Sequence, residues 1–563
     1  MCPVPFRSGH IFFNNMKPAR LFYSAALAAL LLLSCGKAGG VSSGEDDSSG
    51  KEGGITYQLL VYSFADAAFG DKYGDIPGVT SRLDYIEALG AGAIWLSPIH
   101  PCGSYHGYDV TDYAAVNPLF GVDDDLRILC RQAHEKGIKV YLDYVLNHTS
   151  VKHPWFTSAK TDAGSEYRDY YIFSKTPRSD IASGKLSMFT GEGYEGYDAG
   201  QWFSTGAGDY WHSHFWTDMF ADINYGPSST CESSAPFKAV CKAAEHWIDL
   251  GIDGFRLDAV KHIYHNASTD ENPVFLKKFY DHCNAYYKSS GRSGDFYMVG
   301  ENLSEANEVA PYYQGLPAMF EFSFWYRLQW AINNGTGKYF VKDILGYQKM
   351  YEKYRSGYIE ATKLSNHDEM RTASVLGGSL EKEKLAACVL LTASGEPYIY
   401  QGEELGYQGT QSGGDEYVRT PIMWKADGSQ TATRALGGKI DRSMLTASIS
   451  VESQEQDESS LLNVYRKFGA LRNNYRALGK RGSMTPHPDY GESSPEELKA
   501  AGVWYRECDG QKMLVVHNFG SDPLALTFEH DSLDEMVASN GRAIVVLGNN
   551  LQLGAYSSAI FKL

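Results

Sequence analysis

Apolar strands alternate with amphipathic helices along most of this chain. In four places a helix with one apolar face ends at a glycine, and an apolar strand follows within a few residues. Thr80 and Ser81 are expected to cap the first of these helices, Asp123 to begin the second and Pro236 to begin the third. The glycines are Gly90, Gly137, Gly251 and Gly395, and the predicted strands are residues 57–64, 93–99, 138–145, the strand into Asp258 and the strand into Tyr400.

Buried strands that alternate with amphipathic helices indicate a parallel sheet covered by helices. A count near eight strands over about 420 residues favours a closed (β/α)₈ barrel, or TIM barrel, over a doubly wound sheet. The last helix of this part is predicted at residues 460–478. We therefore expect an α/β protein whose barrel consists of residues 55–148 and 226–480.

Two segments interrupt this pattern. Residues 149–225 are too long for a strand–helix loop and are rich in glycine, serine and aromatic residues, which predicts a small domain inserted after strand 3. Beyond residue 480 the helices give way to short apolar strands at 502–505, 513–516 and 543–547. These strands predict a C-terminal antiparallel β-sandwich over residues 481–563.

The N-terminal segment has the pattern of an export signal. A basic head at Met16–Arg20, which makes Met16 a candidate start residue, precedes an apolar run that is too short for a spanning helix, so residues 1–34 predict a signal peptide. The run ends Leu32-Leu33-Ser34-Cys35, which resembles a bacterial lipobox and implies lipidation of Cys35. Residues 35–54 are rich in glycine and serine and predict a flexible tether.

Composition narrows the class of partner. The chain has 563 residues, 43% of them hydrophobic, and a net charge of −17, which argues against nucleic acid or an anionic membrane surface as partner. Aromatic residues make up 13% of the chain; they suit stacking on sugar rings, although most are expected in the core. Cys2 and Cys35 lie outside the folded part, which leaves an odd seven of the nine cysteines and no CxxC spacing. We therefore expect neither a disulfide framework nor a cysteine–metal site.

Polar residues gather where the predicted strands end. Arg256 and Asp258 lie two positions apart at one strand end, so their side chains share a face. A carboxylate beside a guanidinium stays ionised at neutral pH, as a nucleophile must. Because barrel enzymes hold catalytic groups at the carboxyl ends of their strands, three carboxylates, an arginine and two histidines are expected to meet at one opening. The other strand-end residues are Asn147, His148, Glu301, His367 and Asp368.

These strand-end segments resemble the signature regions of the α-amylase family, glycoside hydrolase family 13, in the same order. The segment Met219-Phe220-Ala221-Asp222-Ile223-Asn224 resembles a further short motif of that family, with Ala221 where proline is common, and Trp95-Leu96-Ser97-Pro98 matches its second strand. The resemblance spans residues 57–478. It implies Asp258 as nucleophile, Glu301 as general acid/base and Asp368 as transition-state stabiliser. It also implies substrate contacts from Tyr108, His106, His148, Arg256, Lys261 and His367.

Strand geometry agrees with these roles. A retaining glycosidase needs two carboxyl groups about 5–5.5 Å apart, and neighbouring strands lie about 4.8 Å apart. Asp258 and Glu301, at the ends of the fourth and fifth strands, therefore have suitable spacing. Burial and the nearby negative charge should raise the pKa of Glu301 and keep the acid protonated. The predicted chemistry is hydrolysis with net retention.

The resemblance also bears on the bond. Ala259 follows the nucleophile, as in α-1,4-acting members, and Lys261-His262 also resembles α-amylases, whereas residues 419–424 resemble a segment frequent in oligosaccharide-acting members. We predict endo-acting hydrolysis of α-1,4-glucosidic bonds in starch and malto-oligosaccharides. A cyclomaltodextrinase or neopullulanase is the alternative, although residues 36–54 are too short for the extra N-terminal domain usual there. A non-catalytic glucan-binding surface lipoprotein or transporter subunit would be expected to lack at least one of the three carboxylates.

Calcium is the cofactor that the resemblance implies. The family's structural site corresponds to Asn147, Asp222 and the backbone carbonyl of His262, all of which offer the oxygen atoms that Ca²⁺ prefers. Residues 66–75 resemble a second calcium loop, with one residue inserted and the usual asparagine missing, and a solvated acidic turn is the alternative there. Its ligands would be Asp66, Asp71, Asp75 and the carbonyl of Tyr73.

Two further expectations concern location and aromatic residues. The chain resembles the outer-membrane lipoprotein amylases of bacterial starch-utilisation systems, which implies an exported lipoprotein that faces the cell surface and touches the membrane only through its lipid anchor. Outer-membrane glucan-uptake proteins would then be its partners. A group of aromatic residues near the end of the inserted domain is expected in the core rather than against glucan; it comprises Trp202, Trp211, Phe215 and Trp216.

Overall fold

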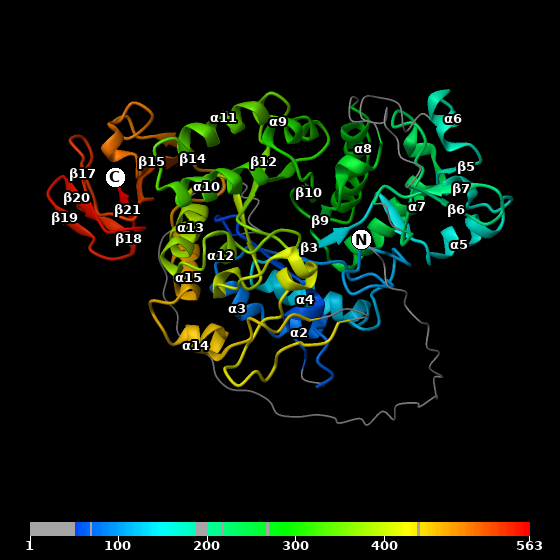
Figure 1. Cartoon of the computed structure of the whole chain (residues 1–563), viewed down its shortest axis with the longest axis horizontal. Coiled ribbons are helices and arrows are strands. Elements are labelled where there is room, and N and C mark those ends of the chain that lie inside the picture. Colours follow the sequence, from blue (N-terminus) through cyan, green and yellow to red (C-terminus); the bar gives the residue numbers. More distant parts are fainter. Residues whose placement is uncertain (1–50, 68–69, 187–200, 216–217, 266–269, 436–439) are drawn as a thin grey trace. The chain divides into compact units, whose positions relative to one another are not determined.

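The computed structural model describes residues 51–67, 70–186, 201–215, 218–265, 270–435 and 440–563 (Figure 1). The predicted signal peptide, Cys35, most of the tether and Trp216 lie outside these residues. Asp47–Leu563 forms one compact unit, and the boundaries predicted between barrel, inserted domain and C-terminal domain remain predictions. Among the described helices, none combines the length and the apolar composition needed to traverse a bilayer.

Eight parallel strands close into a barrel in the order β1-β13-β12-β11-β10-β9-β3-β2, which confirms the predicted fold class. Nearly all residues of these strands are buried, as expected of a sheet with side chains inside and helices outside. The strands are β1 (Thr56–Leu59), β2 (Ala93–Leu96), β3 (Lys139–Tyr144), β9 (Gly254–Leu257), β10 (Tyr297–Gly300), β11 (Ala318–Glu321), β12 (Ile359–Lys363) and β13 (Glu396–Tyr400).

The predicted helix signals are confirmed in α7 (Ala235–Leu250). The Ser234 side chain accepts a hydrogen bond from the Phe237 N–H, Pro236 lies in the first turn, and Gly251 ends the helix with φ of 114°. The other longer helices are α4 (Asp123–Glu135), α8 (Glu271–Ser289), α10 (Phe322–Asn334), α11 (Phe340–Glu352), α13 (Leu380–Thr392) and α15 (Leu461–Asn474). Short helices are α1 (Val61–Phe64), α2 (Ile76–Thr80), α3 (Leu83–Ala88), α5 (Pro154–Thr161), α6 (Pro177–Ala182), α9 (Ala306–Val309), α12 (Thr372–Val375) and α14 (Val451–Glu455).

Two local predictions near the N-terminal end of the barrel are wrong. The predicted strand at 57–64 ends at Leu59, and its second half is α1; because both halves are buried, hydrophobicity alone did not separate them. Thr80 and Ser81 do not cap α3. Their hydroxyls instead donate to the carbonyls of Ile76 and Gly78 at the end of α2, as such side chains do when they compete for local backbone groups.

The inserted segment contains two small antiparallel sheets. β4 (His148–Ser150) pairs with β8 (Phe220–Asp222), so the first and last residues of the insertion return to the same place. The other sheet has the order β5-β7-β6, formed by β5 (Phe173–Ser174), β6 (Trp202–Ser204) and β7 (Tyr210–His212). The insertion therefore closes next to the end of β3, which puts its residues beside the barrel opening.

The C-terminal segment is a β-sandwich. Its five-stranded sheet has the order β14-β15-β16-β21-β18, a three-stranded sheet has the order β17-β20-β19, and one apolar cluster that includes Val516, Leu526 and Phe561 lies between them. The strands are β14 (Ser483–Pro486), β15 (Ala501–Cys508), β16 (Gln511–Asn518), β17 (Leu524–Thr527), β18 (Met536–Asn540), β19 (Val545–Leu547), β20 (Asn550–Leu553) and β21 (Ser558–Lys562).

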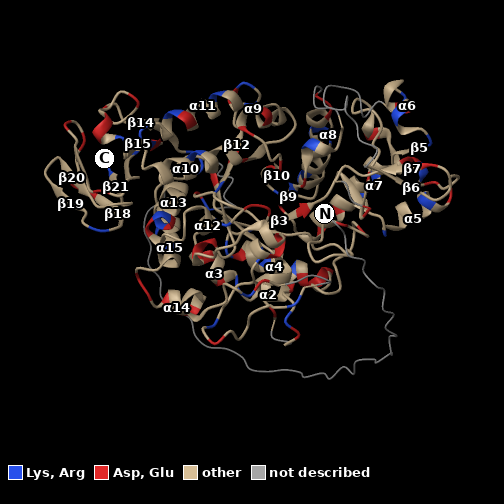
Figure 2. Cartoon of the chain, in the orientation of Figure 1, with Lys and Arg blue, Asp and Glu red and all other residues tan. Residues whose placement is uncertain are grey.

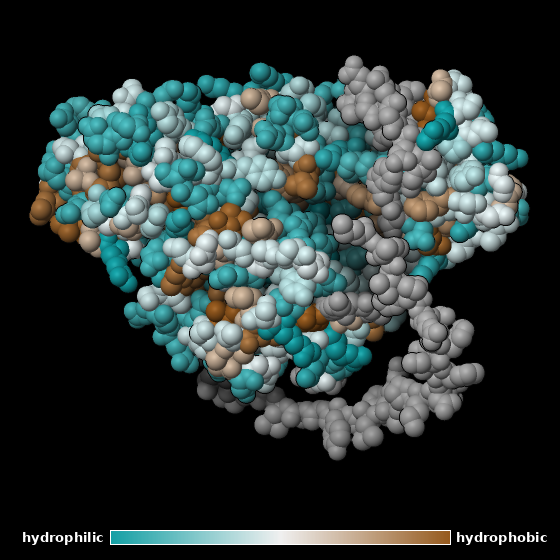
Figure 3. Space-filling view, in the orientation of Figure 1, coloured by the Kyte–Doolittle hydropathy of each residue, from teal (hydrophilic) through white to brown (hydrophobic). Residues whose placement is uncertain are grey.

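Charge is spread over the molecule. Acidic and basic side chains occur on many elements of the barrel and of both flanking segments (Figure 2). The face seen in Figure 3 is mostly hydrophilic, with separate hydrophobic patches. In this view the acidic side chains do not form one block.

Candidate active site

The Arg256 side chain connects the carboxylates at the barrel opening. It is fully buried at the end of β9, where it lies opposite Asp143 of β3. Its Nη1 donates to Oδ1 of Asp258 at 2.6 Å and to Oδ1 of Asp143 at 3.0 Å. Its Nη2 lies 3.8 Å from Oε2 of Glu301. One guanidinium thus brings the residues from three neighbouring strands into a single charged cluster.

Glu301 follows β10 and is mostly buried. Its Oε2 accepts a hydrogen bond from the Ala259 N–H at 2.9 Å, and Ala259 itself has a left-handed backbone with φ of 48°, a conformation that is costly for a residue with a Cβ. Burial, with the nearby charges of Asp258 and Asp368, raises the pKa of Glu301 to about 7, although Arg256 opposes the rise. Glu301 can therefore carry a proton at neutral pH, as predicted for a general acid.

Asp368 is the most exposed of the three acids, with 39% of its side chain accessible. Its Oδ1 accepts from Nη2 of Arg419 at 2.7 Å, and its Oδ2 lies 3.1 Å from Nε2 of His367. Burial alone would raise the pKa of Asp368, but His367 and Arg419 bring it below its ordinary value. Asp368 is therefore held as an anion.

Tyr108 links this third acid to the Arg256 cluster. Its hydroxyl lies 2.6 Å from Nε2 of His367 and donates to Oδ2 of Asp143 at 2.9 Å. The Tyr108 and His367 rings are stacked, with centroids 5.7 Å apart. Asp258, Glu301 and Asp368 therefore belong to one continuous network at the ends of the barrel strands, rather than facing separate surfaces.

The other predicted substrate contacts lie around Tyr108. Nε2 of His148 is 3.2 Å from the Tyr108 carbonyl, and the His106 ring stacks on the Tyr108 ring with centroids 6.0 Å apart. Lys261 lies further from Arg256, since its ammonium donates to the Leu303 carbonyl and to Ser304 in the loop after Glu301.

Two residues of this network had no predicted role. Asp143 lies at the end of β3, a segment already noted for its polar residues, and burial raises its pKa to about 7 despite Arg256. Arg419 belongs to residues 419–424, which resemble a segment of oligosaccharide-acting family members. The sequence predicted no contact for this residue. Its position 51 residues after Asp368 gave no sign that the two would meet.

The residues predicted for the first calcium site lie close together. Asn147 donates through its side-chain amide to the carbonyl of His262. Asp222, at the end of β8, lies next to two histidines through its Oδ2 atom, while its Oδ1 atom is buried without a hydrogen-bond partner. Within the described part of the chain, the residues whose side chains are grouped closely enough to hold a metal ion are His212, Asp222 and His265.

The predicted calcium loop carries three acids. Asp66, Asp71 and Asp75 each accept backbone hydrogen bonds within residues 66–78, and Oδ1 of Asp66 is buried without a partner. Burial raises the pKa of Asp75 to about 6, and the charges of Asp66 and Asp71 add to the rise. The loop therefore concentrates negative charge that its own hydrogen bonds do not balance.

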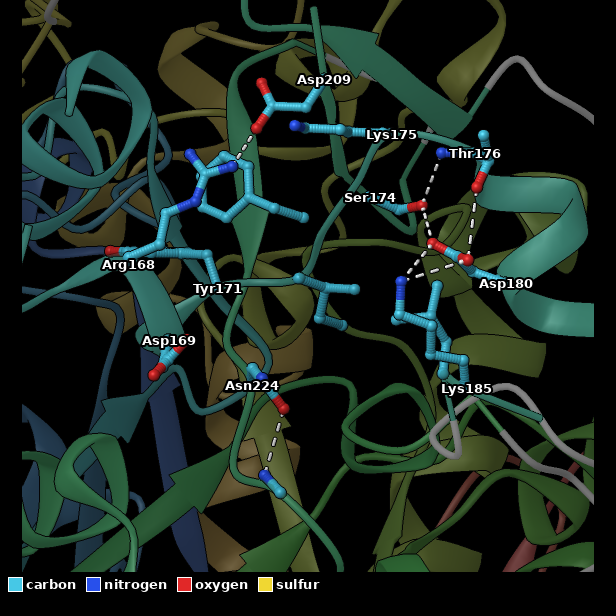
Figure 4. A pocket seen from close by; sticks show the side chains of 14 residues that line it. Arg168, Asp169, Tyr171, Ser174, Lys175, Thr176, Asp180, Lys185, Asp209 and Asn224 are labelled. Carbon is cyan, nitrogen blue, oxygen red and sulfur yellow. Dashed lines mark hydrogen bonds and ion pairs between the residues drawn. The ribbon is translucent and has the colours of Figure 1, made fainter. Parts of the chain in front are cut away.

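A separate cavity of about 540 Å³ lies in the inserted segment and includes none of the predicted catalytic or calcium-binding residues. Figure 4 shows Arg168 directed towards Asp209 and Lys185 towards Asp180. Because these charges pair with one another, the cavity does not present an unbalanced charge for a substrate. The predicted catalytic residues therefore lie in the Arg256 cluster and not in this cavity.

Residues 58–481 match the family described as "Alpha amylase, catalytic domain", and residues 502–560 match "Alpha-amylase SusG C-terminal domain". The chain belongs to the α-amylase family. Alpha-amylase SusG of Bacteroides thetaiotaomicron is 43% identical to it over 640 aligned positions, which cover 91% of this chain and 92% of that protein. Alpha-amylase 3 of Dictyoglomus thermophilum is 34% identical, and the alignment covers 90% of this chain and 93% of that protein.

Solved structures agree. The α-amylase from H. orenii superposes with a TM-score of 0.74 at 29% identity, covering 91% of this chain and 99% of that one. Membership of the α-amylase family confirms the predicted fold class and the prediction of a glycoside hydrolase that carries out α-amylase-type hydrolysis of starch.

The aromatic residues predicted near the end of the inserted segment of this α-amylase family member differ in burial. Trp202 and Trp211 are buried at 7% and 2% exposure, so they lie in the core as predicted. Phe215 is 37% exposed, and its ring lies edge-on to that of His148 at 5.4 Å. Phe215 therefore lies beside the active site rather than in the core.

Proposed function

We propose that this protein is a retaining, endo-acting α-amylase that cleaves α-1,4-glucosidic bonds in starch and malto-oligosaccharides through a covalent glucosyl–aspartate. The observation that carries this proposal is the contact of one buried guanidinium, Arg256, with Asp258 at 2.6 Å and its approach to Glu301 at 3.8 Å. Two carboxyl groups at one site, one of them with a raised pKa, meet the requirement of a retaining mechanism.

In the first step, a carboxylate oxygen of Asp258 bonds to C1 of the attacked glucosyl unit while the bond from C1 to the glycosidic oxygen breaks. Glu301 gives its proton to that oxygen, which leaves as a hydroxyl group on the departing chain. Arg256 orients Asp258 through a charge-assisted hydrogen bond. The anionic Asp368 stabilises the positive charge that develops at C1.

In the second step, water attacks C1 and releases Asp258, and the ionised Glu301 takes the proton of that water. Two inversions at C1 give net retention. His148, His367 and Tyr108 lie around the same opening and supply hydrogen bonds to hydroxyl groups of the bound sugar, which fixes the ring for attack.

The proposal is tested by product analysis. The purified chain is incubated with amylose, pullulan and cyclodextrin, and both the product lengths and the anomeric form of the first product are recorded. Internal cleavage of amylose with an α-anomeric product is expected. Asp258→Asn and Glu301→Gln should abolish hydrolysis with circular dichroism unchanged; turnover retained by either variant, or a β-anomeric product, would reject the assignment.

A cyclomaltodextrinase or neopullulanase is the second candidate, favoured by Arg419, which comes from the segment that resembles oligosaccharide-acting members and contacts Asp368. The same substrates distinguish the two, because that enzyme would cleave cyclodextrin and pullulan faster than amylose. A non-catalytic glucan-binding protein would bind these substrates without releasing any product.

Calcium is proposed as the cofactor at both predicted sites. The buried and unpartnered Oδ1 of Asp222, together with the contact between Asn147 and the His262 carbonyl, supports the first site. The unpartnered Oδ1 of Asp66 among three acids supports the second. Oxygen ligands of this kind fit Ca²⁺. The ion would tie the inserted segment to the barrel at the first site and neutralise the loop after β1 at the second.

The proposed location is the cell-surface face of the outer membrane, through a lipid on Cys35, with glucan-uptake proteins as partners. The lipobox-like sequence before Cys35 supports this proposal. Labelling with a radioactive fatty acid in the native host should modify the wild-type chain and not the Cys35→Ser variant. Equal labelling of both chains, or labelling of neither, would contradict it.

A further inference from the structure

Two histidines from different parts of the fold meet at one carboxylate. Asp222 ends β8, His212 ends β7, and His265 lies in the segment after the strand that bears Asp258. Nδ1 of His212 lies 2.7 Å from Oδ2 of Asp222, and Nε2 of His265 lies 3.0 Å from the same oxygen. All three side chains are at most 2% exposed, and one ligand atom from each lies within 4.8 Å of the others.

The Asp222 carboxylate has no lysine or arginine as an ion-pair partner in the described part of the chain. The two histidines are the ion-pair partners of Asp222 among the residues that the structure describes. An ionised carboxylate out of contact with water is costly unless a cation accompanies it.

The donor atoms select the kind of cation. Imidazole nitrogens together with a carboxylate are the ligands of zinc and related transition ions, whereas Ca²⁺ prefers a shell of six to eight oxygens. Here the side-chain atoms that approach Oδ2 of Asp222 are two nitrogens, Nδ1 of His212 and Nε2 of His265. The calcium proposed above would use the other carboxylate oxygen, Oδ1.

Two further side chains, Gln201 and His214, lie next to the histidines of this cluster. Nε2 of His212 lies 3.1 Å from Oε1 of Gln201, so the Gln201 oxygen favours a proton on Nε2, and Nδ1 then presents its lone pair to a metal ion. The His214 ring stacks on the His265 ring with centroids 5.3 Å apart, and its Nδ1 is buried without a hydrogen-bond partner. The His214 ring therefore lies beside the proposed ligand His265.

We propose that His212, Asp222 and His265 bind a divalent transition metal ion of the zinc type, with Gln201 orienting His212. None of these three residues has a part in the proposed hydrolysis. It would join β7, β8 and the segment after β9, and so fix the inserted segment against the barrel. Its existence does not depend on the substrate proposed above.

The test measures metal content. The full chain is stripped with a chelator, dialysed against a small excess of Zn²⁺ with Ca²⁺ present, and analysed by mass spectrometry of the metal. One zinc per chain is expected for the wild type and none for His212→Gln or His265→Gln. Gln201→Leu should weaken zinc binding about 10- to 100-fold. His134→Gln is the control, because His134 also pairs with an aspartate, Asp253, but has no second histidine beside it.

A second measurement covers the case in which a histidine variant does not fold. Wild-type protein loaded with Co²⁺ should show the visible absorption of a cobalt ion with nitrogen ligands, and added Zn²⁺ should remove it. The proposal is overturned if the wild type retains Ca²⁺ but no zinc, if the folded histidine variants retain zinc as the wild type does, or if the cobalt-loaded protein lacks that absorption.

Discussion

The guanidinium of Arg419 lies 2.7 Å from Oδ1 of Asp368, a residue 51 positions earlier in the chain. The Nε atom of Arg419 also donates to the carbonyl of His367 at 2.9 Å. Arg419 is 5% exposed. The buried Arg419 guanidinium therefore pairs with the Asp368 carboxylate and also hydrogen-bonds to the backbone of the preceding residue.

Replacing Arg419 should impair catalysis more than stability. A hydrogen bond to a charged group contributes about 1.5–3 kcal/mol, so Arg419→Met is expected to lower kcat by about 10- to 100-fold. The acidic limb of the pH–rate profile should move to higher pH, because the pKa of Asp368 rises without its partner. The profile is measured on soluble amylose.

Arg419→Lys and Arg466→Met serve as controls. The lysine keeps the positive charge, so the acidic limb should stay nearer to its wild-type position. Arg466 pairs with Glu455 away from the active site, and its loss should leave the profile unchanged. An unaltered acidic limb in Arg419→Met would show that Arg419 does not control the charge of Asp368.

The raised pKa of Glu301 predicts an alkaline limit of activity. Because the first step needs protonated Glu301, kcat/KM should fall as the pH rises above about 7. A substrate whose leaving group needs no proton, such as α-maltosyl fluoride, should show a weaker fall of kcat/KM with rising pH. The same alkaline limb with both substrates would assign it to another group, such as Asp143.

The same pKa predicts a stability effect. The folded protein binds the Glu301 proton more tightly than the unfolded chain, whose pKa is near 4.5. This contribution to the free energy of unfolding is therefore full below pH 4.5 and is lost as the pH rises to about 7. Glu301→Gln should be more stable than wild type at pH 8, by up to about 3 kcal/mol, and equally stable near pH 4. Denaturant unfolding at both pH values measures this, and a gain of the same size at pH 4 would contradict the linkage.

Phe215 is expected to contact the substrate. Its ring is exposed beside His148, and an aromatic contact contributes about 0.5–1.5 kcal/mol. Phe215→Ala should raise KM by about 2- to 10-fold with a small change in kcat. Tyr210→Ala removes another exposed ring of the inserted segment and is the control. If both variants kept the wild-type KM, Phe215 would have no part in binding.

Chelation should lower thermal stability if calcium is bound. An ion present at about 100 times its dissociation constant stabilises the folded state by about 2.7 kcal/mol. Scanning calorimetry with and without a chelator should show a lower Tm after removal, restored by added Ca²⁺. Asp66→Asn should reduce this difference, whereas Asp281→Asn, at an exposed position on α8, should not. An unchanged melting curve after verified removal would argue against both sites.

The pattern along the chain predicted the barrel because each unit repeats local signals. In α7, the capping Ser234, the early Pro236 and the terminal Gly251 act within a few residues of the helix, so they are visible without the fold. Predictions failed where the local sequence pattern was equally compatible with a strand and a helix. Both β1 and α1 are apolar and buried, and only the parallel pairing of Thr56–Leu59 with β2 and β13 separates them.

The sequence alone predicted which groups carry the chemistry, because Asp258, Glu301 and Asp368 each end a predicted strand and lie in segments that resemble the family's signature regions. The tertiary structure alone decided what surrounds them. Arg419 approaches Asp368 and His265 approaches Asp222 only after distant segments fold together. The physical reason is that spacing along a strand or helix fixes neighbours within one element, whereas charge balance and burial depend on elements that meet through packing.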